Sequence, residues 1–118
     1  MVTVSSHTLN SVDGTHAGGV PVQLIRIDAD GARSTIFATE TDPGGRLAEE
    51  VADEDVSAEV TYELVLGVGA YYDGRGLGRD GAKILREAVV RFSMAEGLER
   101  YHIPFMLAPH SYSIWYSG

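Results

Sequence analysis

The sequence predicts a mainly β protein, in which two antiparallel sheets pack face to face as a β-sandwich with one short helix. Short runs of alternating apolar and polar residues recur along the chain, as in strands with one buried face. Clusters of Gly, Asp and Pro, which favour turns, separate these runs. About seven or eight short strands in this pattern are typical of a sandwich. Because no internal repeat or linker divides the chain, we expect residues 1–118 to form a single domain.

The first half of the chain is expected to supply three strands. Residues 2–9 (VTVSSHTL) and 19–27 (GVPVQLIRI) are rich in β-branched residues and alternate in polarity. The sequence DADGAR at 28–33 favours a turn, and STIFATE at 34–40 returns as the third strand. A second turn is expected at 41–46, where TDPGGR combines Pro with two glycines.

The second half is expected to supply four further strands. TYELVLGV at 61–68 and EAVVRFSM at 87–94 are the first two. YHIPFMLA at 101–108 follows, and SYSIWY at 111–116 is the last strand, after Pro109.

The segment between the strands at 61–68 and 87–94 interrupts the pattern. We expect the short helix near its start, around Ala70–Asp73, and a glycine loop after it. Residues 76–81 (GLGRDG) formally match the GxGxxG motif of dinucleotide sites. That motif binds pyrophosphate only between a strand and a helix of a βαβ unit, and the sequence indicates no such unit. A flexible loop is therefore the better interpretation.

Composition excludes several classes of function. The formal net charge is −8, and the cations do not cluster, so nucleic acid is not an expected partner. The sequence has no cysteine, which excludes disulfides and thiolate metal sites and fits a reducing compartment. No apolar run approaches the roughly 20 residues of a membrane span, and the first residues do not resemble a secretion signal. We therefore expect a cytoplasmic protein that does not bind membranes.

Two histidines are expected on strand faces that point away from the core. Side chains alternate across a strand, and the run at 101–107 has one wholly apolar face, which should be buried: Tyr101, Ile103, Phe105 and Leu107. His102 then lies on the opposite face. In the first strand Val2 and Val4 are expected to point inward, so that His7 points outward. Such histidines are often merely solvated, and an inert role stays open. The spacing of the four histidines does not indicate a metal site.

Four motifs, in order along the chain, resemble one known family. They are SHTLNSVDGTHAGGVPVQL at 6–24, TDPGGR at 41–46, GAYY at 69–72 and YHIPFMLAPHSYS at 101–113. Together they resemble 5-hydroxyisourate hydrolase, the bacterial and peroxisomal relative of transthyretin, and the resemblance runs nearly end to end. It implies a transthyretin-like sandwich that forms a homotetramer, with active sites in a channel between dimers and no metal or organic cofactor.

The resemblance also implies a catalytic set. The catalytic His, Arg and His of the family fall on His7, Arg46 and His102. The family opens the ring of 5-hydroxyisourate, the product of urate oxidation, with water. A neutral imidazole suits the base that this step needs, and we assign that role to His102, with His7 orienting water or substrate; the two roles could be exchanged. Arg46 suits the oxygen that becomes negative in the tetrahedral intermediate.

The C-terminal tail departs from the family, whose members end in Tyr-Arg-Gly-Ser where this chain has Trp115, Tyr116, Ser117 and Gly118. We expect Trp115, Tyr116 and Ser117 to contact substrate, with aromatic stacking in place of the missing cation. Less prominent departures are Asn10 for a usual Asp and His16 for a usual Pro. Three functions remain open: 5-hydroxyisourate hydrolase, a hydrolase of a less acidic or alkylated cyclic amide, and a non-catalytic binding protein like transthyretin. Alternatively, the tail only forms an edge strand that buries Trp115 at a subunit interface.

Overall fold

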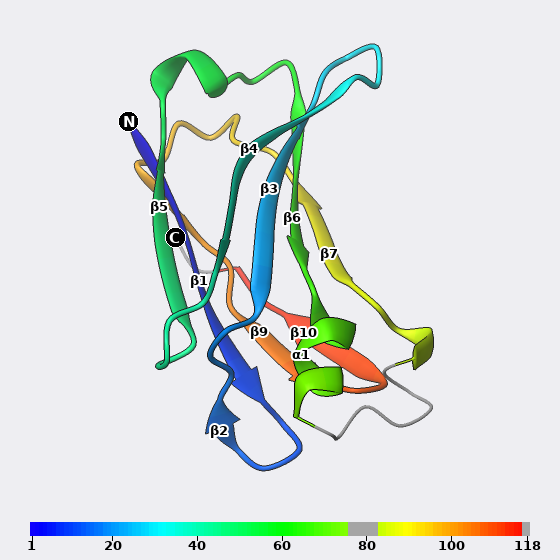
Figure 1. Cartoon of the computed structure of the whole chain (residues 1–118). Helices are drawn as coiled ribbons and strands as arrows, with labels where there is room; N and C mark the ends of the chain where they lie inside the picture. Colours follow the sequence, from blue (N-terminus) through cyan, green and yellow to red (C-terminus); the bar gives the residue numbers. More distant parts are fainter. Residues whose placement is uncertain (76–82, 117–118) are drawn as a thin grey trace.

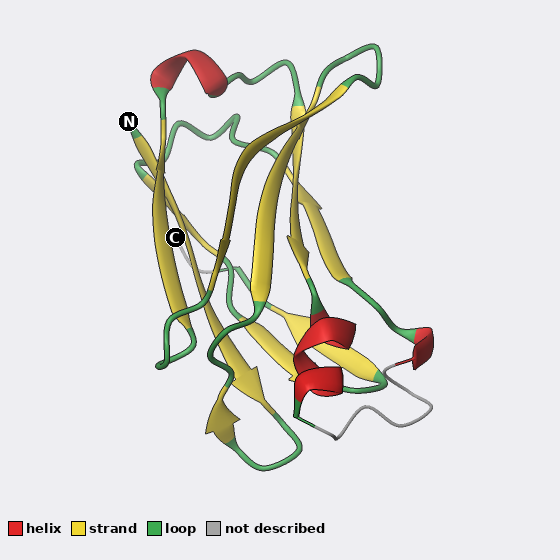
Figure 2. Ribbon diagram, in the orientation of Figure 1, coloured by secondary structure: helices red, strands yellow, loops and turns green. Residues whose placement is uncertain are grey.

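The computed structural model describes residues 1–75 and 83–116 and consists of two facing β-sheets with one short α-helix at one end (Figure 1, Figure 2). This confirms the predicted mainly β sandwich. The GxGxxG segment at 76–81 lies outside the described residues. No helix in the described ranges is long and apolar enough to cross a membrane.

The first sheet is built around the first strand of the chain. In the described residues it has six strands: β1 (Val2–Asn10), β2 (Thr15–His16), β5 (Arg46–Val51), β8 (Arg100–His102), β9 (Phe105–Ala108) and β10 (Ser111–Ile114). β1 pairs antiparallel with β2 and β5, and parallel with β8 and β9. It therefore has neighbours on both sides along most of its length.

The second sheet runs in the order β4-β3-β6-β7, with antiparallel pairing throughout. Its strands are β3 (Pro21–Ile27), β4 (Arg33–Glu40), β6 (Thr61–Leu66) and β7 (Ala88–Phe92). The 3-10 turn η1 (Asp53–Asp55) lies between β5 and β6, and the helix α1 (Val68–Gly74) follows β6. The helix is slightly longer than the sequence predicts.

Three strand assignments differ from the sequence-based expectation. The run at 101–108 forms two strands, β8 and β9, because Pro104 has no N–H for the ladder. The other two differences are β2 and β5, which the sequence analysis did not assign. Arg46, expected to close a turn, is the first residue of β5.

The core lies between the sheets and includes the face predicted for the run at 101–107. Tyr101, Ile103, Phe105 and Leu107 are all buried, as expected. They pack with side chains of β1, β3 and β6, among them Val4, Leu24 and Leu64. Each such buried side chain contributes roughly 1.5–3 kcal/mol relative to an exposed one.

The inner face of β1 becomes polar toward its end, and these buried groups fix its neighbours. The Ser6 hydroxyl donates to the carbonyl of Ile103 at 2.7 Å, and the Thr8 hydroxyl donates to the carbonyl of Ala17 at 2.6 Å. Asn10 accepts a hydrogen bond from the hydroxyl of Tyr72 at 2.8 Å. Since a buried polar group without a partner is costly, each bond favours one position of the β8–β9 segment, the β1–β2 hairpin or α1 relative to β1.

Candidate active site

The strand pairing brings His7, Arg46 and His102 to one face of the first sheet. His7 on β1 is the register partner of Arg46 on β5, and Ser5 is the register partner of His102 on β8. Ser5 and His7 are two residues apart on one strand, so their side chains share a face. All three residues implied by the resemblance therefore lie together on the face turned away from the core.

The hydroxyl of Ser5 anchors the ring of His102. Ser5 Oγ lies 2.8 Å from His102 Nδ1, and Arg100 Nη1 donates to the same oxygen at 3.4 Å. The imidazole is half-buried. Burial lowers the pKa of His102 below its usual value, and the cations Arg100 and Arg46 lower it further. The ring is therefore neutral at pH 7 and above, with Nδ1 held by Ser5.

A shallow pocket of about 200 Å³ opens beside His102. The two arginines Arg46 and Arg100 contribute to its lining. The full lining is Ser5, Ser6, Asp42, Arg46, Leu47, Ala48, Arg100 and His102. The sequence analysis gave Arg100 no role. Its place in the pocket follows from the register of β8, since residues 100 and 102 share a face.

The turn at 41–46 holds Arg46 at the start of β5. One carboxylate oxygen of Asp42 accepts hydrogen bonds from the backbone N–H groups of Gly44 and Arg46, both at 2.9 Å. Gly45 has φ +76°, and a Cβ there would collide with the carbonyl of Thr8. Only glycine fits this position without strain. No side chain in the described ranges accepts a hydrogen bond from the Arg46 guanidinium, so its donors are available to a ligand.

His7 contacts a second histidine that the sequence analysis gave no role. His7 Nε2 lies 2.9 Å from His16 Nδ1, and the two rings meet edge to edge, with centroids 5.0 Å apart and an interplanar angle of 26°. Burial lowers the pKa of His7, and Arg46, His16 and His102 also lower it; a hydrogen bond with the backbone of Gly44 raises it. The sequence analysis did not assign a turn here. An Asp-Gly pair such as Asp13–Gly14 is typical of a hairpin turn, but the contact depends on the hairpin register, which the sequence does not reveal.

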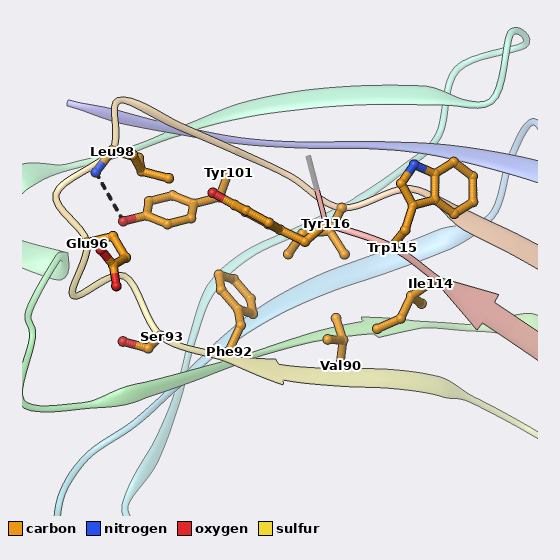
Figure 3. A pocket seen from close by; sticks show the side chains of 10 residues that line it. Val90, Phe92, Ser93, Glu96, Leu98, Tyr101, Ile114, Trp115 and Tyr116 are labelled. Atoms are coloured by element: carbon orange, nitrogen blue, oxygen red, sulfur yellow. Dashed lines mark hydrogen bonds between the residues drawn. The ribbon is translucent and has the colours of Figure 1, made fainter. Parts of the chain in front are cut away.

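The aromatic tail lies at a different pocket. Trp115 and Tyr116 line a cavity of about 670 Å³ between the two sheets, as Figure 3 shows. The other residues of its lining are mostly apolar: Val90, Phe92, Ser93, Glu96, Leu98, Tyr101, Ile103 and Ile114. The backbone N–H of Trp115 donates to the carbonyl of Pro104 at 3.3 Å.

The two pockets lie on opposite sides of one segment. Tyr101 and Ile103 line the cavity between the sheets, while Arg100 and His102 line the polar pocket. Within one chain the structure therefore does not bring Trp115 or Tyr116 to His102. Ser117, the third tail residue expected to contact substrate, lies outside the described residues. In the described ranges no three His, Asp or Glu side chains are grouped as a metal site requires.

Comparisons with known proteins place this geometry in one family. Residues 4–118 match the model of the HIUase/Transthyretin family. A 5-hydroxyisourate hydrolase of Pseudomonas aeruginosa is 30% identical over 115 residues, covering 98% of this chain and 90% of the relative. A protein of the same name from Halalkalibacterium halodurans is 33% identical over 112 residues, covering 95% of this chain and 94% of the relative.

Solved structures agree with the sequence relatives. Klebsiella pneumoniae 5-hydroxyisourate hydrolase superposes with a TM-score of 0.78 at 30% identity, covering 100% of both chains. Sea bream transthyretin in complex with thyroxine superposes with a TM-score of 0.82 at 25% identity, covering 97% of this chain and 93% of the other. Matches to both the sequence family and its fold, over nearly the whole length, show that this chain belongs to the HIUase/transthyretin family.

Proposed function

We propose that the protein is a 5-hydroxyisourate hydrolase of urate catabolism. It opens the six-membered cyclic amide ring with water and yields 2-oxo-4-hydroxy-4-carboxy-5-ureidoimidazoline. The observation that carries the proposal is the convergence of His7, Arg46 and His102 on one open face of the first sheet. Relatives that carry this enzyme name support it over nearly the full length.

His102 is the general base in this proposal. A base needs a ring nitrogen with a lone pair, and Nδ1 is already engaged by Ser5 Oγ at 2.8 Å. When Nδ1–H donates to Ser5, the lone pair resides on Nε2. The serine oxygen can accept from Nδ1–H and from Arg100 together, because a hydroxyl has two lone pairs. The depressed pKa of His102 keeps this nitrogen unprotonated near neutral pH.

Arg46 stabilises the charge that develops. Water loses a proton to His102 Nε2 and bonds to the amide carbonyl carbon, whose oxygen becomes negative. Arg46 lines the pocket, and in this mechanism its guanidinium donors bind this oxygen, which a planar fork of donors suits better than a point charge. The C–N bond then breaks, and the proton passes from the imidazolium to the leaving ring nitrogen. The acyl carbon becomes a carboxylic acid, which releases its proton to solvent and leaves a carboxylate on the product. No step needs a cofactor.

The pocket favours an acidic substrate despite the altered tail. Arg46 and Arg100 both line it, so two cations are present without the tail arginine of the family. The alternative of a less acidic or alkylated amide rested on aromatic residues entering the site. Trp115 and Tyr116 line the other pocket in the same chain. Their expected contact with substrate therefore requires a neighbouring copy of the chain.

A homotetramer with sites between dimers remains part of the proposal. β7 and β10 are edge strands of their sheets and lie beside each other. The backbone N–H of Val89 donates to the Tyr112 hydroxyl oxygen, with 3.4 Å between N and O. Exposed apolar side chains occur on these two strands, on β9 and in the tail: Val89, Met106, Tyr112, Ile114, Trp115 and Tyr116. Such a patch, beside open sheet edges, favours association with a second copy. The cytoplasm is the proposed compartment, because a sequence without cysteine suits a reducing environment.

A coupled ultraviolet assay tests the proposed reaction. Urate oxidase generates 5-hydroxyisourate in the cuvette, and its absorbance decay is followed with and without this protein. We expect clear acceleration, which His102→Ala reduces roughly a hundredfold or more. His110→Ala is the matched control, since His110 is exposed on the turn before β10. Decay at the spontaneous rate with folded protein would reject the proposal and favour a binding role like that of transthyretin.

A further inference from the structure

His16 contacts His7, one of the proposed catalytic residues, but is not itself one of them. It lies on β2, where it is the register partner of Leu9, and its ring meets the ring of His7 edge to edge. Two ring nitrogens 2.9 Å apart can share one proton only, because two N–H groups facing each other would repel. One of the two imidazoles must therefore donate and the other must accept.

The surroundings of His7 favour one direction for this hydrogen bond. The turn that contains Gly44 lies beside His7, since the N–H of the next residue, Thr8, donates to the carbonyl of Gly45 at 2.7 Å. The backbone of Gly44 also raises the pKa of His7, which is the effect of a carbonyl that accepts a hydrogen bond. His7 Nε2 faces His16, so Nδ1 is the nitrogen left to donate to this carbonyl. His7 then carries its proton on Nδ1 and accepts at Nε2, and His16 donates from its own Nδ1.

We propose that His16 is a positioning residue, which fixes the ring plane of His7 and holds it in the Nδ1–H tautomer. The inference rests on the proposed function for its catalytic consequence, since His7 belongs to the proposed catalytic set. Both nitrogens of His7 are engaged in this arrangement. His7 is therefore not the base; it is a fixed ring that orients substrate, and His102 alone has a nitrogen for the proton of water.

The fold places His16 firmly. The next residue, Ala17, donates its N–H to the carbonyl of Thr8 at 2.9 Å and accepts from the Thr8 and Thr41 hydroxyls at 2.6 and 2.8 Å. On the other side, Asp13 accepts hydrogen bonds from both the N–H and the hydroxyl of Thr15. The family that the sequence resembles usually has proline at position 16. Proline has no side-chain N–H and could not donate a hydrogen bond to His7.

Three side chains that face His7 from neighbouring strands lower its pKa. Arg46 projects from β5, His102 from β8 and His16 from β2, and each acts to lower the pKa of His7. The carboxylate of Asp42, on the adjoining turn, already accepts two backbone N–H groups. A neutral donor at position 16 is therefore compatible with this set, whereas an anion there would attract a proton to His7 Nε2.

Three substitutions of His16 distinguish the effect of its N–H donor from the effect of its side-chain volume. His16→Asn keeps an N–H near the position of Nδ1, His16→Ala removes the donor, and His16→Asp replaces it with an acceptor. Long-range ¹⁵N–¹H spectra of the full-length protein report the tautomer and the pKa of His7 directly. The same samples provide kcat and KM for 5-hydroxyisourate across pH.

We expect the Nδ1–H tautomer of His7 in the wild type and in His16→Asn. His16→Ala should give a mixture of tautomers, a higher His7 pKa and a kcat lowered roughly tenfold, with a smaller change in KM. His16→Asp should shift His7 to the Nε2–H tautomer. His110→Ala should leave every reading unchanged, and backbone spectra outside the hairpin verify folding of each variant.

Two results would overturn the proposal. One is a wild-type His7 that carries its proton on Nε2; the other is a tautomer and pKa of His7 that are the same in His16→Ala as in the wild type. If the wild type lacks activity on 5-hydroxyisourate but the tautomer responds as expected, the positioning role stands and the proposed function fails.

Discussion

His7 on β1 and Arg46 on β5 are directly opposite each other in an antiparallel strand pair, so the imidazole and guanidinium leave the sheet side by side. Burial is the largest cause of the lowered pKa of His7 and of His102, and the Arg46 cation lowers both values further. The arrangement keeps two imidazoles neutral beside a permanent positive charge. It suits a reaction that needs an unprotonated base and a developing anion in one place.

Arg46→Lys should damage turnover although it conserves charge. Lysine offers a single ammonium in place of the planar fork that would face the developing oxyanion, so we expect kcat to fall by roughly a hundredfold. Steady-state kinetics in the coupled assay measure the effect. Arg33→Lys is the matched control, because Arg33 pairs with Glu63 on the other sheet. A fully active Arg46→Lys variant would remove the proposed role.

Arg100→Gln should change substrate binding more than chemistry. Arg100 lines the polar pocket but contacts only Ser5 Oγ among the hydrogen bonds of its side chain in the described ranges. Losing this cation should raise KM for an anionic substrate several-fold, by roughly 1 kcal/mol, and leave kcat within a small factor. The KM increase should shrink as ionic strength rises, since salt screens the lost attraction. A KM that is unchanged at low salt would show that Arg100 does not bind substrate.

Stability should rise with pH through the range just below the usual histidine pKa. His7 and His102 titrate near 6.5 when unfolded, and burial and neighbouring cations lower both values in the folded protein. Between the folded and unfolded values the unfolded state binds more protons, so the free energy of unfolding falls as pH drops through this window. Urea unfolding at about pH 5.5 and 7.5 measures the slope.

The double variant His7→Ala, His102→Ala should flatten this dependence. His110→Ala should leave it as in the wild type. An equally steep slope in the double variant would assign the effect to other groups.

Gly45→Ala should destabilise the protein and displace Arg46. The residue has φ +76°, and the added Cβ would collide with the carbonyl of Thr8. A cost of about 1–3 kcal/mol in the free energy of unfolding is expected, with reduced activity in the molecules that fold. Gly44→Ala is the control, because its Cβ would meet only the Asp42 side chain at an ordinary distance. Equal stability of the two variants would contradict this account of the turn.

Trp115→Ala and Tyr116→Ala distinguish a substrate contact from a structural role. If a neighbouring copy presents the tail to the polar pocket, each variant should raise KM while the assembly mass stays unchanged. If the residues only fill the cavity between the sheets, stability or association should fall while KM is preserved. Analytical ultracentrifugation and the coupled assay decide between these outcomes. Trp115 is the only tryptophan in the sequence, so its fluorescence reports directly whether substrate reaches it.

Local sequence patterns predicted most of the strands and which of their faces are buried. Alternation placed Tyr101, Ile103, Phe105 and Leu107 in the core and turned His102 away from it, as the structure confirms. Turn residues marked the segments at 28–33 and 41–46, and the helix was expected within a few residues of α1. These features depend on properties of neighbouring residues: side-chain period, turn preference and helix-breaking glycines.

Only the tertiary structure revealed which strands pair, in which register, and which distant side chains therefore meet. Ser5 meets His102, 97 residues away in sequence, because β8 pairs parallel with β1; no local pattern specifies that pairing. The same holds for His16, which reaches His7 through one hairpin register. The tail gives the third example, since Trp115 follows β10 into the gap between the sheets. A strand's own sequence determines which side chains share a face, whereas contacts between distant segments, which folding selects together, determine what that face meets.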